Sequence, residues 1–194
     1  MGPVTQSLLI ANIAVYLLQS VVGEALFDYF ALWPLQAGFW PWQVVTYSFL
    51  HDPTSLTHIL FNMLALYMFG SDIERVFGPR RMLAYYFVCV VTAAVAQLAV
   101  SWAMQSPPAP VVGASGGVFG LLLAFGMYFP RRTLMLIFPP IPMPAWLFVT
   151  LYGGIELFLG VTGTQQGVAH FAHLGGMLGG FLMIRSWRSG SRLR

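Results

Sequence analysis

Long apolar runs separated by short polar segments dominate the chain. They cover residues about 5–27, 56–76, 82–104, 114–129, 144–162 and 168–187. A helix crosses a bilayer with about 20 apolar residues. The fourth and fifth runs are weaker because Gly and Pro interrupt their edges, but a bundle of neighbouring helices tolerates short spans. The pattern predicts an all-α polytopic membrane protein, a six-transmembrane-helix bundle that forms a single domain over residues 1–194.

Composition leads to the same class of protein. Hydrophobic residues make up 58% of the chain and charged residues 8%, whereas a soluble domain carries about 25% charged residues. The formal net charge is +3, but the chain has no basic run with interleaved aromatic residues such as nucleic-acid binding would need. We therefore expect a lipid bilayer as partner and no nucleic acid. The first apolar run has neither a basic segment before it nor a clear cleavage site, and we expect it to be retained as a span.

The basic residues fix a predicted orientation. All of them are arginines, at positions 75, 80, 81, 131, 132, 185, 188, 192 and 194. With six spans, every one falls on the same side, which the preference for cytoplasmic positive charge makes the inner side. The prediction is a multi-pass protein of the cell (inner or plasma) membrane with both termini in the cytoplasm. The loops at 28–55, 105–113 and 163–167 then lie outside, and the aromatic-rich loop at 28–55 is expected to be partly embedded in the membrane.

Polar side chains within the spans gather near one end of the predicted bundle. His58 and Asn62 are four residues apart on the second span, and His170 and His173 are three apart on the sixth, so each pair shares a helix face. Ser115 begins the fourth span. All five positions map to the outer side, and ionisable groups in a bilayer are costly enough to suggest a function. The sequence therefore predicts one site at this end.

A serine and a histidine together suggest nucleophilic catalysis, because neutral imidazole can take the hydroxyl proton near pH 7. Two other readings stay open. His58, His170 and His173 are a possible metal set, although no carboxylate adjoins them in the sequence as in His-Glu-x-x-His sites. Glu156, in the middle of the fifth span, is either a third catalytic residue or, as we expect, a structural hydrogen-bond partner of a neighbouring helix.

The motifs and their order resemble the rhomboid family of intramembrane serine proteases, over nearly the whole chain. The resemblance rests on four segments: His58-Ile-Leu-Phe-Asn62, Gly113-Ala-Ser115-Gly116, Ala172-His173 followed by Gly176 and Gly180, and Glu74-Arg75. The chain resembles the minimal form of the family, which has six spans. Trp42-Gln43 stands where many members have Trp-Arg, and Phe119 stands where some carry a Tyr that packs on the histidine.

The resemblance implies a catalytic dyad without a third, acidic member. Ser115 would be the nucleophile and His173 the general base. The side chains of His58 and Asn62 and the backbone N–H of Ser115 would bind the oxyanion. It also implies single-span membrane proteins as substrates, cut near the outer end of their helix and admitted past the second and fifth spans.

The resemblance implies no metal or cofactor. Residues expected to pack at the site are Gly113, Gly116, Phe119, Gly176 and Gly180. From their position at the start of the fifth span, Trp146 and Phe148 are candidate gate residues. The alternative within the family is a non-catalytic relative that binds membrane proteins, which intact serine and histidine positions argue against.

Overall fold

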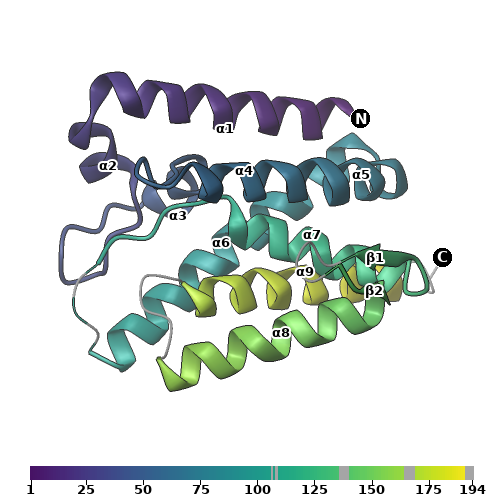
Figure 1. Cartoon of the computed structure of the whole chain (residues 1–194). Coiled ribbons are helices and arrows are strands. Elements are labelled where there is room, and N and C mark those ends of the chain that lie inside the picture. Colours follow the sequence, from purple (N-terminus) through teal and green to yellow (C-terminus); the bar gives the residue numbers. More distant parts are fainter. Residues whose placement is uncertain (106, 108, 136–139, 164–168, 191–194) are drawn as a thin grey trace.

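Helices make up most of the computed structural model, which describes residues 1–105, 107, 109–135, 140–163 and 169–190 (Figure 1). They are α1 (Pro3–Val22), α2 (Glu24–Phe30), α3 (Gln43–Thr46), α4 (Leu56–Ala65), α5 (Ser71–Phe77), α6 (Pro79–Ala103), α7 (Ser115–Tyr128), α8 (Ala145–Thr162) and α9 (His170–Gly190). A 3-10 turn, η1 (Tyr47–Phe49), follows α3, and a π-helical segment, η2 (Leu66–Gly70), joins α4 to α5. Two short strands, β1 (Thr133–Met135) and β2 (Pro142–Pro144), form an antiparallel hairpin.

Each predicted apolar run coincides largely with helix. Within the described residues, four stretches are long and apolar enough to cross a membrane: Pro3–Val22, Leu56–Phe77, Pro79–Ala103 and Ala145–Thr162. α7 is apolar but shorter, and α9 is less apolar because glycines, histidines and arginines interrupt it. The protein is therefore a helical integral membrane protein, while the count of six spans stays a prediction.

One predicted helix boundary differs from the structure, and another prediction falls on residues that the structure does not describe. The first helix ends at Val22 instead of 27, because Gly23 has a φ of +73° and the chain turns there into α2. Parts of the predicted outer loops and the start of the sixth span lie outside the described residues, namely 106, 108 and 164–168. Arg192 and Arg194 also lie outside them.

α7 lies at the centre and contacts α6, α8, α9 and η2 (Figure 1). Glycines allow its close approach to α9, since a Cβ on Gly176 would meet the backbone of Gly116. Such contacts between small residues are typical of membrane helices. On the other side, the Tyr85 hydroxyl of α6 donates a hydrogen bond of 2.7 Å to the Gly120 carbonyl. The first residues of α7 are thus fixed between two long helices.

One end of the bundle gathers the basic residues. The N-terminus, the α5–α6 turn, the β1–β2 hairpin and the last turn of α9 lie at this end (Figure 1). The described arginines belong to these elements or lie next to them in the sequence. One of them, Arg132, forms an ion pair of 2.7 Å with Asp72. The N-terminus of α7 and the segment between α1 and α4 lie at the opposite end (Figure 1).

The segment between α1 and α4 is held together by the side chain of Gln43. Its Oε1 accepts hydrogen bonds from the backbone N–H groups of Trp33 and Trp40, each at 3.2 Å. Its Nε2 donates to the Tyr29 carbonyl at 3.3 Å, and the rings of Tyr29, Trp40 and Trp42 stack on one another. A glutamine amide can both donate and accept, so Gln43 organises this loop without an arginine.

The same loop reaches the segment that leads into α7. Leu32 and Val111 exchange two backbone hydrogen bonds of 2.9 Å, and the Gly113 N–H donates to the Tyr47 carbonyl at 3.0 Å. The Tyr47 hydroxyl in turn donates to the Val90 carbonyl of α6 at 2.9 Å. The loop therefore helps to place Ser115 as well as closing this end of the bundle.

Glu74 of α5 holds the N-terminus of α1. Its carboxylate accepts hydrogen bonds from the backbone N–H groups of Val4 and Thr5, at 2.9 and 2.8 Å, and from the Thr5 hydroxyl at 2.7 Å. The first N–H groups of a helix have no partner within the helix, and they carry its positive dipole end. This buried carboxylate fastens the start of α1 to α5.

We predict that Glu74→Gln lowers stability without altering the chemistry at the other end of the bundle. Loss of the charge weakens three hydrogen bonds, which should cost about 1–3 kcal/mol. The measurement is thermal unfolding of the purified protein in detergent. An unchanged midpoint would show that α1 does not depend on this carboxylate.

Candidate active site

Ser115 and His173 meet between α7 and α9. Ser115 is the first residue of α7, and His173 lies in the first turn of α9. The Ser115 Oγ is 2.8 Å from the His173 Nε2. The Phe119 ring, one turn further along α7, stacks on the imidazole with centroids 4.2 Å apart and planes at 5°. The arrangement pairs a hydroxyl with a base whose ring plane is held by the stack.

A carboxylate contacts the other nitrogen of His173. Glu156 of α8 is buried, and its Oε2 lies 2.9 Å from the His173 Nδ1. The same oxygen lies 2.6 Å from the Nδ1 of His170. Glu156 thus does bond to a neighbouring helix, as expected, but to the predicted base itself. The resemblance implies no acidic neighbour there; the structure has one because α8 packs against α9 at this level.

Within the described chain, one group of side chains could hold a metal ion. Glu156, His170 and His173 each offer one ligand atom, all within 4.8 Å of one another. The set expected from the sequence contained His58 instead of Glu156. A carboxylate joins it through space, from a different helix, where the sequence shows none adjacent.

His58 faces Ser115 from α4. The His58 Nδ1 accepts a hydrogen bond of 3.3 Å from the Asp52 backbone N–H, so a neutral imidazole carries its hydrogen on Nε2. A Cβ on Gly113, whose φ is +126°, would lie 2.9 Å from that Nε2 and 3.7 Å from the Ser115 Oγ. The His58 Nε2–H is therefore a donor close to the serine, and only glycine leaves room for it at position 113.

Asn62 lies one turn below His58 and is buried. Its Nδ2 donates a hydrogen bond of 2.9 Å to the His58 carbonyl, four residues earlier. An asparagine amide has two N–H groups. One is therefore used within α4, and the second is the donor that Asn62 can offer to the site.

His51 supports His58 from behind. Its ring is fully buried, 5.2 Å from that of His58. Burial, and then the neighbouring His58, lower the pKa of His51 to about 4. The ring therefore stays neutral near pH 7. Its backbone is fixed by the Gln19 amide, which donates to the His51 carbonyl at 2.8 Å and accepts its N–H at 2.9 Å.

A cavity of about 2030 Å³ opens on these residues, lined by Ser115, His173, His58, Asn62 and Phe119 among others. Its walls also include Phe61 and Met68 on one side and Phe148 and Tyr152 of α8 on the other. The rings of Phe148 and Tyr152 stack 4.7 Å apart. Trp146, the other candidate gate residue, is half-exposed at the start of α8 and is not among the residues that line the cavity.

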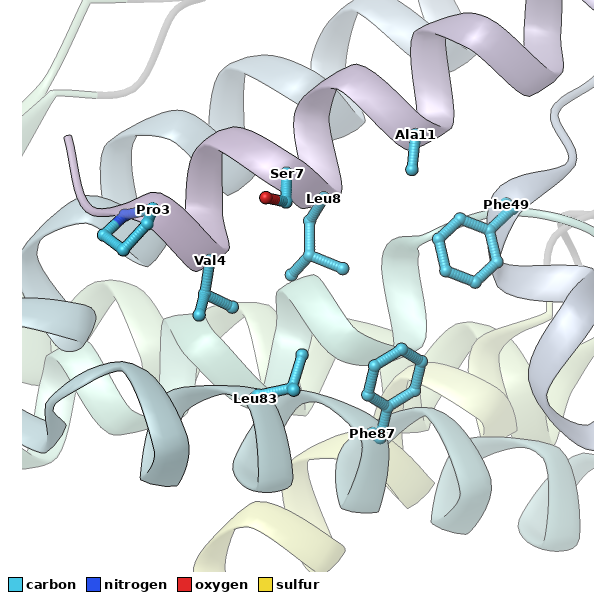
Figure 2. A pocket seen from close by; sticks show the side chains of 8 residues that line it. All are labelled: Pro3, Val4, Ser7, Leu8, Ala11, Phe49, Leu83 and Phe87. Carbon is cyan, nitrogen blue, oxygen red and sulfur yellow. The ribbon is translucent and has the colours of Figure 1, made fainter.

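A second cavity, of about 340 Å³, lies between α1 and α6 (Figure 2). Figure 2 shows it walled by apolar side chains such as Leu8, Leu83 and Phe87, with Ser7 as the polar side chain among those that line it. None of the described residues that line it is ionisable. Ser115 and His173 line the larger cavity.

The predicted packing glycines lie where the helices come closest. Side chains at Gly116 and Gly176 would meet the Ala93 side chain and the Gly116 backbone respectively, and one at Gly180 would meet Tyr85. The sequence prediction did not include Gln43 or Tyr152. Glu156 was open to either role, and its one visible signal was an ionisable residue in the middle of an apolar run.

Comparison with known proteins decides the family. The model of the Rhomboid domain matches residues 39–188. The chain belongs to the rhomboid family. It is 29% identical over 186 residues to the Rhomboid protease GlpG of Yersinia pestis (strain Pestoides F), and 29% identical over 190 residues to that of Serratia proteamaculans (strain 568). Each alignment covers 94% of this rhomboid chain and 62% of the relative, so the chain spans less than two thirds of their length.

We predict that His51 makes the stability of this rhomboid protein depend on pH. Burial lowers its pKa in the folded protein to about 4, below the ordinary histidine value of about 6.5, so the unfolded chain binds the proton first as the pH falls. Stability is then fully present above about pH 6.5 and is lost towards pH 4, by about 3 kcal/mol in all.

The measurement compares thermal unfolding of wild type and His51→Gln in detergent between these pH values. The variant lacks the titrating ring, so its midpoint should fall less on acidification. Parallel curves for the two proteins would contradict the assignment to His51.

Proposed function

We propose that this protein is an intramembrane serine endopeptidase in which Ser115 is the nucleophile and His173 the general base. The observation that carries the proposal is the 2.8 Å contact between the Ser115 Oγ and the His173 Nε2, at the wall of a large cavity inside an apolar bundle. Membership of a family whose listed relatives are named rhomboid proteases supports it.

The reaction follows from these atoms. As the Ser115 Oγ bonds to the scissile carbonyl carbon, its proton passes to the His173 Nε2 and the carbonyl electron pair moves onto oxygen. His173 then gives the proton to the peptide nitrogen, and the C–N bond breaks. Water next loses a proton to His173 and attacks the acyl carbon. The C–Oγ bond breaks, and Ser115 regains its proton.

The negative oxygen of the intermediate needs donors. The His58 Nε2–H, the second N–H of Asn62 and the Ser115 backbone N–H would supply them. Ser115 begins α7, so its N–H has no partner within the helix and lies at the positive dipole end. Donors fixed in advance by the fold stabilise an oxyanion more than water does, since they need not reorient.

We propose single-span membrane proteins as substrates, admitted between α4 and α8. Phe61 of α4 and Phe148 and Tyr152 of α8 all line the cavity, so an opening between these two helices would lead a substrate to Ser115. Phe148 would act as the gate, with Trp146 at its edge. A helical substrate hides its carbonyls in hydrogen bonds, so cleavage requires local unwinding and would favour helix-breaking residues near the cut.

The proposed topology has both termini in the cytoplasm. The arginine-bearing end of the bundle would be the cytoplasmic one. Ser115, at the opposite end of α7, would then open to the outer face, and the substrate would be cut near the outer end of its helix. The aromatic stack of Tyr29, Trp40 and Trp42 would lie at the outer headgroup level.

A metal-dependent reaction is the second candidate function, because Glu156, His170 and His173 could hold an ion. It differs chemically from the first. An ion there would engage the His173 ring and would make cleavage sensitive to chelators. The serine mechanism requires no cofactor.

We predict that Ser115→Ala and His173→Ala each reduce cleavage of a tagged single-span reporter to background, because both remove a proton-transfer partner. Purified protein in detergent, with and without a chelator, is the assay. Ser20→Ala is the control, since Ser20 is exposed and its hydroxyl donates to the Leu17 carbonyl of its own helix. Cleavage by Ser115→Ala would refute the serine mechanism, and inhibition by chelators would favour the metal alternative.

We predict a graded effect at the oxyanion donors. His58→Ala should lower kcat about 10²–10³-fold, as loss of one such donor does. Asn62→Ala should cost less, roughly tenfold, because one of its N–H groups is used within α4. Leu60→Ala on the exposed face of α4 serves as control. Full activity of His58→Ala would remove it from the oxyanion site.

A further inference from the structure

Glu156 is a buried ionisable group of the site that the proposed dyad does not use. It lies in the middle of α8, and its Oε2 contacts two imidazole nitrogens, at 2.9 Å in His173 and 2.6 Å in His170. All three side chains are about nine-tenths buried. Placing a carboxylate in an apolar bundle is costly unless it is paired. The pairing must therefore be specific, and one partner is the base.

We propose that Glu156 is the positioning residue of this protease: it holds the Nδ1–H of His173 so that the unprotonated Nε2 faces Ser115. The inference rests on the proposed function. It extends the Ser115–His173 dyad to a Ser–His–Glu arrangement drawn from three helices, α7, α9 and α8.

Hydrogen-bond chemistry supports the proposal. An ionised carboxylate only accepts, so each contacting Nδ1 must donate an N–H to Oε2. A neutral His173 with its hydrogen on Nδ1 has a free lone pair on Nε2. That is the atom 2.8 Å from the Ser115 hydroxyl, so the hydroxyl donates to it. The carboxylate thereby selects the tautomer that a general base needs.

The stack of His173 on Phe119 does not by itself orient Nε2 towards Ser115. Parallel rings 4.2 Å apart fix the plane of the imidazole, but a 180° rotation about the Cβ–Cγ bond keeps that plane and would put the Cε1 carbon where Nε2 faces Ser115. The contact between Glu156 and Nδ1 favours the orientation in which Nε2 faces the serine. His170 occupies the same carboxylate oxygen from the preceding turn of α9, which restrains Glu156 in the orientation that reaches His173.

Charge adds a second effect. When His173 takes the serine proton it becomes an imidazolium, and the carboxylate at Nδ1 stabilises it in the transition state. Among the described residues, the titratable groups around His173 include Glu156 from α8, His170 from α9 and His58 from α4. Glu156 is the anion among them.

The test is the substitution Glu156→Gln, which keeps the shape and removes the charge. We expect kcat on the reporter to fall about a hundredfold with KM within about twofold, because the substrate itself does not touch this residue. Labelling of Ser115 by a fluorophosphonate serine reagent should slow in parallel. Glu156→Asp, which keeps a carboxylate, should recover part of kcat.

Glu74→Gln is the matched control, since Glu74 is also buried and also accepts hydrogen bonds from a second helix. It should lower the unfolding midpoint and leave labelling per folded molecule unchanged. If Glu156→Gln behaves like Glu74→Gln, Glu156 merely links α8 to α9 and the inference fails. Chelator-sensitive cleavage would also overturn it, because an ion would then occupy these atoms.

The failure of the proposed function is distinguishable from the failure of this inference. Cleavage that survives Ser115→Ala removes the serine mechanism altogether. Cleavage that is lost in Ser115→Ala and His173→Ala but complete in Glu156→Gln leaves a dyad without an acidic member.

Discussion

The close approach of α7 and α9 underlies the whole arrangement. Gly116 and Gly176 bring the two backbones into contact, and a side chain at Gly176 would push the helices apart. Lipid tails are as apolar as leucine, so membrane helices gain little from burying apolar surface and depend on such packing. The Ser115 hydroxyl and the His173 ring meet because they stand beside this contact. A separation larger by one methyl group would break a 2.8 Å hydrogen bond.

The polar groups of the site stabilise one another in a chain. The Asp52 N–H fixes the tautomer of His58, and the Asn62 amide is held within its own helix. On the far side, the Glu156 Oε2 contacts the Nδ1 atoms of two imidazoles at once. In an apolar surrounding, an unpaired member of such a chain would be costly. The same free-energy cost restricts the orientation of each imidazole ring, because one orientation satisfies the hydrogen bonds of its neighbours.

The loop between α1 and α4 links the site to the surface of the bundle. The Gln43 amide organises its backbone, the Leu32–Val111 pair joins it to the segment before α7, and Tyr47 accepts the Gly113 N–H. Gly113 then turns the chain beneath His58 into the first turn of α7. The loop is therefore joined to the segment before Ser115 directly, through backbone hydrogen bonds.

The sequence by itself determined the helical membrane class, the approximate limits of the helices and the grouping of arginines, because each depends only on hydrophobic length and charge along the chain. It also singled out Ser115, His58, Asn62 and His173, since polar residues within apolar runs are few. Only the tertiary structure decided that Glu156 reaches His173 and His170. The spacing within one helix fixes which residues share a face, but the rotation and relative height of two packed helices depend on side-chain contacts such as those at Gly116 and Gly176.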